Sequence, residues 1–292
     1  MKNVLVIYNP VAGHHSPVNL PKIIHAECNK AGVTVMWFDT LPQEKQPLEQ
    51  FLTFSFDLIM VVGGDGTVNE VAKFILHNKL KTPLAIVANG SGNILAQSLK
   101  IPIFPSSRAV TFALKNKPRK IDVMQINEKF YGLIAAGQGY DVIFVHGATR
   151  ELKRWFGIGA YLVSFFKTFF AYRRHTFTVE VDGKIHIVKA KVVAVFNVLS
   201  LFGVHFHKAV KVDDGILNVV VINPRSLWDL VRILFKTLFS HAGPDDKRLR
   251  FFEGKEIRIT EADGQRIQVD GEIMHEKSLH VTVLPNALTV IY

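Results

Sequence analysis

The sequence predicts an α/β domain followed by a second, mostly antiparallel β domain. In the first 122 residues, short apolar runs alternate with segments of helical periodicity, which is typical of a parallel sheet wrapped by helices. After residue 123, apolar and polar residues alternate with period two between Asp-Gly turns, as antiparallel strands do. The chain has 292 residues, enough for two cores, so we predict domains at 1–122 and 123–292.

Four apolar runs are the predicted strands of the first domain. They are continuous rather than alternating, as expected when helices cover both faces of a sheet. The runs are Val4–Tyr8, Val33–Phe38, Leu58–Val62 and Leu84–Val87. Right-handed crossovers between parallel strands put any ligand at the carboxyl ends of the strands.

Six segments are the predicted strands of the second domain. They are Thr176–Val181, Lys184–Phe196, Gly215–Ile222, Glu256–Thr260, Arg266–Val269 and Leu279–Leu284. The dipeptides Asp182-Gly183, Asp263-Gly264 and Asp270-Gly271 separate them, and Asp-Gly is a strong hairpin signal.

A glycine-rich turn, Gly63-Gly64-Asp65-Gly66-Thr67, follows the third predicted strand and opens a helical pattern. Glycine lets the backbone approach a ligand closely, and the positive end of the helix dipole favours an anion. Asp65 and Thr67 are candidate caps of this helix. The turn alone fits a phosphate cradle or an ordinary capped turn.

Two further polar loops follow predicted strands. Asn9-Pro10-Val11-Ala12-Gly13 comes after the first strand, and Asn89-Gly90-Ser91-Gly92-Asn93 comes after the fourth. Because the carboxyl ends of parallel strands meet at one edge of the sheet, the three loops are expected to converge there. Their shared position favours a nucleotide or another phosphate ligand.

Composition limits the partners and the compartment. The net charge is +10, from 35 basic and 25 acidic residues, which favours a nucleotide, a nucleic acid or an acidic membrane surface. The single Cys28 excludes an intrachain disulfide, and the first apolar run is too short for a signal peptide, so we expect an intracellular protein.

Two segments raise the question of membrane contact. Trp155–Tyr172 is almost entirely apolar, but Lys167 and two glycines favour a buried or interfacial helix over a spanning one. Ser226–His241 has the pattern of an amphipathic helix. It either packs on its own domain or lies at an anionic lipid interface.

Six motifs in order across nearly the whole chain resemble the catalytic domain of the diacylglycerol kinase and sphingosine kinase superfamily. They are Asn9 to Gly13, Gly63 to Glu70, Gly90 to Asn93, Gly137-Gln138-Gly139-Tyr140-Asp141, Asp214-Gly215-Ile216-Leu217 and Val269-Asp270-Gly271-Glu272. The resemblance implies a Rossmann-like, NAD kinase-like first domain, a β-sandwich-like second domain and a site in the cleft between them. It implies a bacterial-type lipid kinase that uses ATP and Mg²⁺.

The resemblance also assigns roles to residues. Glu272 would be the general base, with Asp65 as a second catalytic residue that acts through Mg²⁺ or a bound water. The metal would be held by Asp214 and the backbone carbonyls of Lys211 and Ile216, which are hard oxygen donors. ATP would be bound by Asn9, Pro10, Val11, Ala12, Gly13, Thr40, Gly64, Asp65, Gly66, Thr67, Val68, Asn69, Glu70 and Ser91.

The predicted function is therefore transfer of the γ-phosphoryl group of ATP to the hydroxyl of diacylglycerol, a sphingoid base or a related lipid alcohol. We expect a cytoplasmic enzyme of phospholipid biosynthesis, peripheral at the inner membrane surface, that binds no nucleic acid; a homodimer is compatible with the sequence. The alternatives are a soluble NAD kinase-like enzyme, which would share Gly63 to Thr67, and a non-catalytic protein of the membrane surface. The second alternative leaves Asp65, Asp214 and Glu272 without a role.

Overall fold

The chain forms two compact units. The computed structural model describes residues 2–12, 19–40, 48–139, 173–198, 200–201, 204–205, 211–226, 228–229, 232, 248–261, 267–276 and 278–292. The first unit contains residues 1–123, 200–203 and 285–292, and the second contains 124–199 and 204–284. Two strands, β5 (Pro118–Ile126) and β18 (Ser278–Ile291), therefore contribute one part of their length to each unit.

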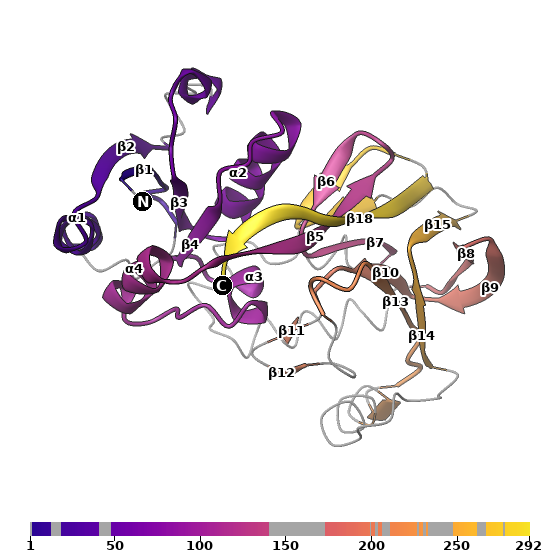
Figure 1. Cartoon of the computed structure of the whole chain (residues 1–292). Coiled ribbons are helices and arrows are strands. Elements are labelled where there is room, and N and C mark those ends of the chain that lie inside the picture. Colours follow the sequence, from indigo (N-terminus) through magenta and orange to yellow (C-terminus); the bar gives the residue numbers. More distant parts are fainter. Residues whose placement is uncertain are drawn as a thin grey trace. The chain divides into compact units, whose positions relative to one another are not determined.

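A parallel sheet is the centre of the first unit (Figure 1). Its strands lie in the order β2-β1-β3-β4, and the last part of β18 runs parallel to β4 with Val290 opposite Leu84. All four sequence-predicted strands are present. The elements are β1 (Asn3–Tyr8), α1 (Leu20–Lys30), β2 (Thr34–Asp39), the 3₁₀ helix η1 (Leu48–Thr53), β3 (Leu58–Gly63), α2 (Asp65–His77), β4 (Leu84–Ala88), α3 (Ile94–Ser98), α4 (Ser106–Lys115) and the two-residue β11 (Ser200–Leu201).

Helices cover both faces of this sheet (Figure 1). One face packs on α1 and α4, which contribute Ile24, Cys28 and Val110 to a core shared with Val4 and Met60. The residues that alternate with these along β1 and β3 are buried as well, against the face that α2 covers. Burial on both faces explains why the strands are continuous apolar runs in the sequence.

The strand order places a topological switch point between β1 and β3. The chain leaves β1 toward β2 on one side and leaves β3 toward β4 on the other. In open α/β sheets the ligand crevice forms outside the carboxyl ends of the two strands at such a point. In this chain those ends are followed by Asn9 and by the Gly63 to Thr67 turn.

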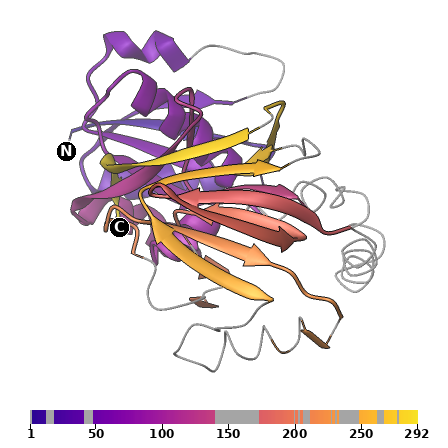
Figure 2. The same cartoon turned by 90° about the vertical axis from the view of Figure 1, so that its right-hand side faces the viewer.

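The second unit is an antiparallel β-sandwich (Figure 2). One sheet has the order β14-β13-β10-β7-β16-β17, and the other contains β18, β15, β8 and β9, with β5 beside β18 and β6 beside β5. A single core lies between the sheets, with Phe177, Val193 and Ile257 all fully buried. The remaining strands are β6 (Phe130–Gly132), β7 (Ala135–Gly139), β8 (His175–Val181), β9 (Lys184–Ala190), β10 (Val192–Phe196), β12 (Val204–His205), β13 (Leu217–Ile222), β14 (Leu249–Gly254), β15 (Glu256–Glu261), β16 (Ile267–Val269) and β17 (Glu272–Met274). The predicted fold class is confirmed.

The structure corrects two predicted strands. The segment Lys184–Phe196 is not one strand, because the chain passes at Lys191 from β9 in one sheet to β10 in the other. The predicted strand Leu279–Leu284 is extended to Ile291, because its end pairs with β4. Strands β5, β6, β7, β14 and β17 were not predicted, since none combines period-two alternation with flanking turn residues.

Among the described residues, no helix has the length and apolar character needed to cross a bilayer. The predicted helix at Trp155–Tyr172 lies outside the described residues, as does Ser226–His241 apart from Ser226, Trp228, Asp229 and Arg232.

Asp57 ties the start of β1 to the segment before β3, and the attachment depends on pH. Its carboxylate accepts N–H bonds from Asn3 at 3.0 Å and Lys2 at 2.6 Å. These bonds, with that of Asn3 foremost, hold the pKa of Asp57 below its ordinary value. A depressed pKa means that the stabilising contribution is complete above an unfolded pKa of about 3.9 and is lost as the pH falls through the folded-state pKa.

We therefore predict that Asp57→Asn lowers the melting temperature at pH 7 and that its deficit relative to the parent protein shrinks below about pH 4. Thermal unfolding followed by circular dichroism between pH 3 and 7 measures this. Asp213→Asn, at an exposed carboxylate, is the control and should follow the parent. A deficit that is the same at every pH would contradict the role of the Asp57 charge.

Candidate functional site

Asn9 joins the loop after β1 to the turn after β3. Its backbone N–H donates to the carbonyl of Val62 at 2.9 Å, and its side-chain Nδ2 donates to Thr67 Oγ1 at 2.8 Å. Its Oδ1 accepts from the N–H of Val11 at 3.1 Å. The Asn9 side chain thus links the two loops at the switch point and fixes their relative position.

Asn89 attaches the third loop to the other two. Its backbone N–H donates to the carbonyl of Gly63 at 2.8 Å, and its Nδ2 donates to the carbonyl of Ala12 at 3.1 Å. The loops after β1, β3 and β4 are therefore held together by direct hydrogen bonds. The predicted convergence of the three loops is observed.

The turn after β3 and the loop after β4 touch through glycine backbones. A Cβ built on Gly90 would lie 2.5 Å from the Cα of Gly64, and one built on Gly64 would lie 3.2 Å from the Cα of Gly90. A separation of 2.5 Å is well inside van der Waals contact, so no side chain fits at Gly90 without movement of the backbone. Packing therefore requires glycine at position 90, and a Cβ at position 64 would be tight, whatever the loops bind.

Asn93 shapes the loop after β4 from within. It has a left-handed backbone with φ of 51°, which Asn adopts more readily than most residues. Its Oδ1 accepts from the N–H of Gly90 at 2.9 Å, and its Nδ2 donates to the Gly90 carbonyl at 2.8 Å. The loop is closed on itself around Ser91 and Gly92, both of which are exposed.

Neither Asp65 nor Thr67 caps α2, which corrects the sequence prediction. The cap position is Gly64, without a side-chain hydrogen bond. Asp65 Oδ1 instead accepts from the N–H of Leu95 at 3.2 Å, in the first turn of α3, and Thr67 accepts from Asn9. Both side chains bond to residues of other loops, so neither accepts a hydrogen bond from the free N–H groups at the start of α2.

The start of α2 has the geometry of helix starts that bind anions. The first N–H groups of a helix have no acceptor within the helix, and the helix dipole adds partial positive charge there. With no side-chain cap, these groups belong to Asp65, Gly66 and Thr67, directly beside the loop that begins at Asn9. Such a helix start binds phosphate or carboxylate oxygens.

The other predicted nucleotide-binding residues have varied settings. Thr40 lies just beyond β2, where its N–H donates to the Tyr8 carbonyl at 2.8 Å. Val68 and Asn69 are buried, whereas Glu70 is exposed one turn into α2. Gly13 lies outside the described residues. Pro10 and Val11 lie in the loop after β1, where Val11 is exposed.

Asp270 anchors one end of the six-stranded sheet in the second unit. Its carboxylate accepts three backbone N–H bonds, from Leu133 at 2.6 Å and from Ile134 and Ala135 at 2.9 Å each. On the other side of the same segment, Asn197 Nδ2 donates to the Leu133 carbonyl at 3.0 Å. The segment that leads into β7 is therefore fixed from both sides.

Glu272 stands on the hairpin that Asp270 anchors. Asp270 and Gly271 have φ of 47° and 93°, the left-handed pair that a type I′ turn needs. The turn joins Val269 to the opposing Glu272, the first residue of β17, and the Glu272 residue is exposed. The predicted base is thus a carboxylate at the tip of a hairpin whose turn is fixed by three hydrogen bonds.

Asp214 begins the turn before β13. Its Oδ1 accepts from the N–H of Ile216 at 3.1 Å, and Gly215 has φ of 70°. Asp214 and Lys211 are exposed. The proposed donor set, one carboxylate and two backbone carbonyls, consists of oxygen alone and fits a hard cation such as Mg²⁺. No group of three or more His, Cys, Asp or Glu side chains that could hold a metal occurs among the described residues.

Asp214 and Glu272 lie at the same end of one sheet but far apart across it. Since each neighbouring pair is antiparallel, β13, β7 and β17 all start at this end. Four strand spacings separate β13 from β17, which at about 4.8 Å each makes roughly 19 Å. Mg²⁺ ligands lie about 2.1 Å from the ion, so the two carboxylates do not share one ion directly. This separation is compatible with the predicted roles, because Asp214 is expected to hold the metal and Glu272 is expected to be the general base.

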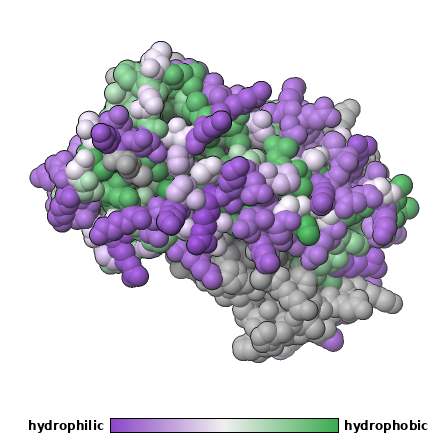
Figure 3. All heavy atoms as spheres, in the orientation of Figure 1, coloured by the Kyte–Doolittle hydropathy of each residue, from purple (hydrophilic) through white to green (hydrophobic). Residues whose placement is uncertain are grey.

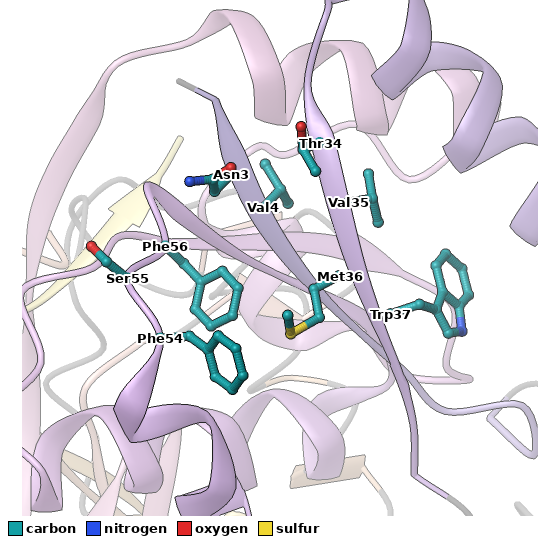
Figure 4. A pocket seen from close by; sticks show the side chains of 9 residues that line it. All are labelled: Asn3, Val4, Thr34, Val35, Met36, Trp37, Phe54, Ser55 and Phe56. Carbon is teal, nitrogen blue, oxygen red and sulfur yellow. The ribbon is translucent and has the colours of Figure 1, made fainter.

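An apolar hollow of about 520 Å³ lies at the other end of the strands of the first unit (Figure 4). The side chains of Phe54, Phe56 and Met36 point toward one another there, next to the first residues of β1 and β2. Figure 3 shows hydrophobic side chains gathered over this part of the unit. The hollow lies at the amino ends of the strands, so it is separate from the loops at their carboxyl ends.

Two family models match the chain, one after the other. The diacylglycerol kinase catalytic domain matches residues 3–126, and the YegS C-terminal NAD kinase beta sandwich-like domain matches residues 134–292, more than half of the chain. The chain belongs to the diacylglycerol kinase family. It is therefore an enzyme of the lipid kinase class, a phosphotransferase.

Relatives of this diacylglycerol kinase family member share about a quarter of its residues. An uncharacterized protein of Synechocystis is 26% identical over 98% of this chain and 69% of its own length. A protein of Staphylococcus aureus named "Putative lipid kinase" is 26% identical over 80% of this chain and 77% of its own. A crystal structure described as a diacylglycerol kinase from Bacillus anthracis has a TM-score of 0.80 and 24% identity, covering 100% of this chain and 97% of that one, which supports the fold.

Three asparagines, Asn9, Asn89 and Asn197, position loops of this kinase, and the sequence patterns do not predict this positioning role. The motifs indicate only ATP binding for Asn9 and a place in a polar loop for Asn89. Each one follows directly the last residue of a buried strand, after Tyr8, Ala88 and Phe196 respectively. An Asn at the end of an apolar run is the signal that finds such residues, because its amide bonds to backbone groups of a neighbouring loop.

We predict that Gly90→Ala destabilises the kinase by about 1–3 kcal/mol, the usual cost of overpacking, because the new Cβ meets the Gly64 backbone. Denaturant unfolding measures this. Gly66→Ala is the matched control, since a Cβ at Gly66 would meet no atom within 4 Å and Gly66 lies in a helix, where Ala is favoured by up to about 1 kcal/mol. Equal free energies of unfolding in the two variants would contradict the prediction, because the contact between Gly64 and Gly90 would then leave room for a Cβ.

Proposed function

We propose that this enzyme transfers the γ-phosphoryl group of ATP to the hydroxyl of a lipid alcohol. The observation that carries the proposal is the meeting of three glycine loops at the uncapped start of α2. Backbone N–H groups and a helix N-terminus are the parts that bind phosphate groups in nucleotide sites. The proposal assigns ATP binding to residues 1–122 and lipid binding to residues 123–292.

Phosphoryl transfer depends on positioning and on stabilisation of charge. The loops at Asn9, Gly64 and Ser91 would fix the phosphates through backbone groups. Asp65 bonds to Leu95, so it keeps the loop after β4 in register with the start of α2. Its catalytic contribution would be made through this positioning and through a bound water or ion, since an anion does not itself bind phosphate.

Glu272 would accept the proton of the lipid hydroxyl as that oxygen attacks the γ-phosphorus. Its exposure at the start of β17 leaves it accessible to an acceptor, and the Asp270 anchor limits its movement. A fixed carboxylate is a suitable general base when the hydroxyl lies within hydrogen-bonding distance. Mg²⁺ supplies positive charge when bound, and Asp214 with the carbonyls of Lys211 and Ile216 would hold it.

The acceptor defines where the enzyme works. A lipid alcohol resides in a bilayer and ATP in the cytoplasm, so the reaction belongs at the cytoplasmic membrane surface. Diacylglycerol is the acceptor named by the family, and the Gly90-Ser91-Gly92-Asn93 loop resembles the sphingosine and ceramide kinase branch. A sphingoid acceptor is therefore included in the test.

The deciding experiment incubates the protein with labelled ATP and Mg²⁺ in mixed micelles that contain diacylglycerol, sphingosine or ceramide, and in parallel with NAD. Label in a lipid product supports the proposal and identifies the acceptor. Label in NAD and in no lipid refutes it in favour of a dinucleotide kinase, the activity suggested by the description of the second domain. Label in neither, with vesicle binding intact, favours a protein of the membrane surface.

We predict that Glu272→Gln lowers kcat by at least about a hundredfold while the Kd for ATP changes little, because only the proton acceptor is lost. Steady-state kinetics and calorimetry separate the two quantities. Glu276→Gln, four residues away, is the matched control and should retain parental turnover. Parental kcat in Glu272→Gln would remove Glu272 from its role.

We also predict that Asp214→Asn raises the Mg²⁺ concentration for half-maximal activity at least about tenfold, because the only charged ligand of the proposed set is removed. Titration of activity with Mg²⁺ at saturating ATP measures the shift. Asp213→Asn, an adjacent exposed carboxylate, should leave the titration unchanged. A shift of the same size in both variants would point to general electrostatics instead.

A further inference from the structure

We propose that a surface formed by Trp228, Arg225, Arg232 and Arg250, the Trp228 surface, docks this enzyme on the headgroups of an anionic lipid bilayer. The inference rests on the proposed function only in that a lipid acceptor requires a membrane. It assigns the contact to particular residues of the second unit. None of these four residues lies in the loops proposed to bind ATP, and none is the proposed metal ligand Asp214 or the proposed base Glu272.

Trp228 is a large apolar side chain left in water. It is 80% exposed, although the next residue, Asp229, is only 7% exposed. Trp is the residue that best fits the region of lipid headgroups, because its ring is apolar and its indole N–H is polar. Because the Trp228 ring is already exposed, it can enter the headgroup region without breaking contacts inside the protein.

Asp229 fixes the backbone on which Trp228 stands. Its Oδ2 accepts from the N–H of Arg225 at 2.8 Å and of Ser226 at 3.2 Å. Its Oδ1 is paired with Arg248 Nη1 at 2.6 Å, which attaches this turn to the start of β14. The outward position of Trp228 is thus set by a buried and well-bonded neighbour.

The charge around Trp228 is positive. Arg225, Arg232 and Arg250 are all exposed. Arg250 is the second residue of β14, close in the chain to Arg248, which directly precedes the strand and pairs with Asp229. In the described residues of 216–232 and 248–252 the only acidic side chain is Asp229, and its charge is neutralised by Arg248.

An anionic bilayer matches both properties of this surface. Exposed arginines bind acidic headgroups, and a Trp among them enters the interface below the phosphates. The overall charge of +10 acts in the same direction at longer range. Nucleic acid carries negative charge but has no apolar layer for an indole to enter. The loss of binding in Trp228→Ala therefore distinguishes an anionic bilayer from nucleic acid.

The test measures sedimentation of the full chain with large unilamellar vesicles of phosphatidylcholine alone or with 30% phosphatidylglycerol. We expect binding to the anionic vesicles that is at least tenfold weaker in Trp228→Ala and in the triple variant Arg225→Gln, Arg232→Gln, Arg250→Gln. Phe104→Ala is the matched control for the aromatic residue, since Phe104 is also 80% exposed but belongs to the first unit. Lys79→Gln, Lys81→Gln, Lys117→Gln is the control for charge, and both controls should bind as the parent does.

Several results would overturn the proposal. Parental vesicle binding by Trp228→Ala, equal losses in the controls, or equal binding of the parent to neutral and anionic vesicles each contradict it. Tighter binding to duplex DNA than to anionic vesicles, weakened equally by Trp228→Ala, would replace the bilayer with nucleic acid. Unchanged melting temperatures of all variants are required, and Trp228→Phe repeats the test with a smaller perturbation.

Turnover of a water-soluble short-chain diacylglycerol, without vesicles, separates the two proposals. We expect the Trp228 surface variants to keep parental turnover in this assay while losing turnover on vesicles. Absence of any kinase activity in the parent, with the predicted pattern of vesicle binding, refutes the proposed function and leaves the docking surface standing. Parental activity on vesicles in Trp228→Ala refutes the docking surface and leaves the kinase standing.

Discussion

The contact between the backbones of Gly64 and Gly90 is the constraint on which the loop geometry of the first unit depends. Two loops that follow neighbouring strands meet at a distance that excludes any side chain at Gly90. This approach brings the Asp65 carboxylate to the first turn of α3 and the Asn89 amide to the loop after β1. Side chains that would otherwise cap helices or face water are used to join loops. The start of α2 is left without a side-chain cap as a result, which is the arrangement of helix starts that bind anions.

Much of the fold follows from local sequence. Strands β1, β3 and β4 of the first unit were predictable because strands buried on both faces are continuous apolar runs, such as Leu58 to Val62, and the edge strand β2 was predictable from its apolar sequence alone. The strand β7 was missed because its sequence, Ala135 to Gly139, contains no β-branched residue and is held by its neighbours on both sides. The break at Lys191 was missed because strand-forming sequence continues on either side of it, alternating in β9 and continuously apolar in β10. Only the tertiary structure shows that the two halves belong to different sheets.

In the candidate site, too, some features follow from local sequence and others depend on long-range contacts. The turn at Gly63 to Thr67 and the helix that it opens could be predicted, because they depend on local sequence. The partners of Asp65 and Thr67 could not, since Leu95 and Asn9 are 30 and 58 residues away in the sequence and either side chain is an equally good cap by local rules. Asp270 was recognised within a motif, yet its three hydrogen bonds join residues more than 130 positions apart. Sequence patterns identify which polar residues matter, and long-range contacts decide what they do.

The strand β18 has a consequence for how the protein is made. Residues 285–292 belong to the first unit, where Leu288, Val290 and Ile291 are buried and Val290 lies opposite Leu84 of β4. On the ribosome, the 120 or so residues that begin this unit emerge long before the strand that completes its sheet. The first unit is therefore expected to remain incomplete, with an uncovered strand edge at β4, until synthesis of the second unit is over. Translation order and assembly order differ in this chain, and a fragment that stops near residue 122 would lack a strand of its own core.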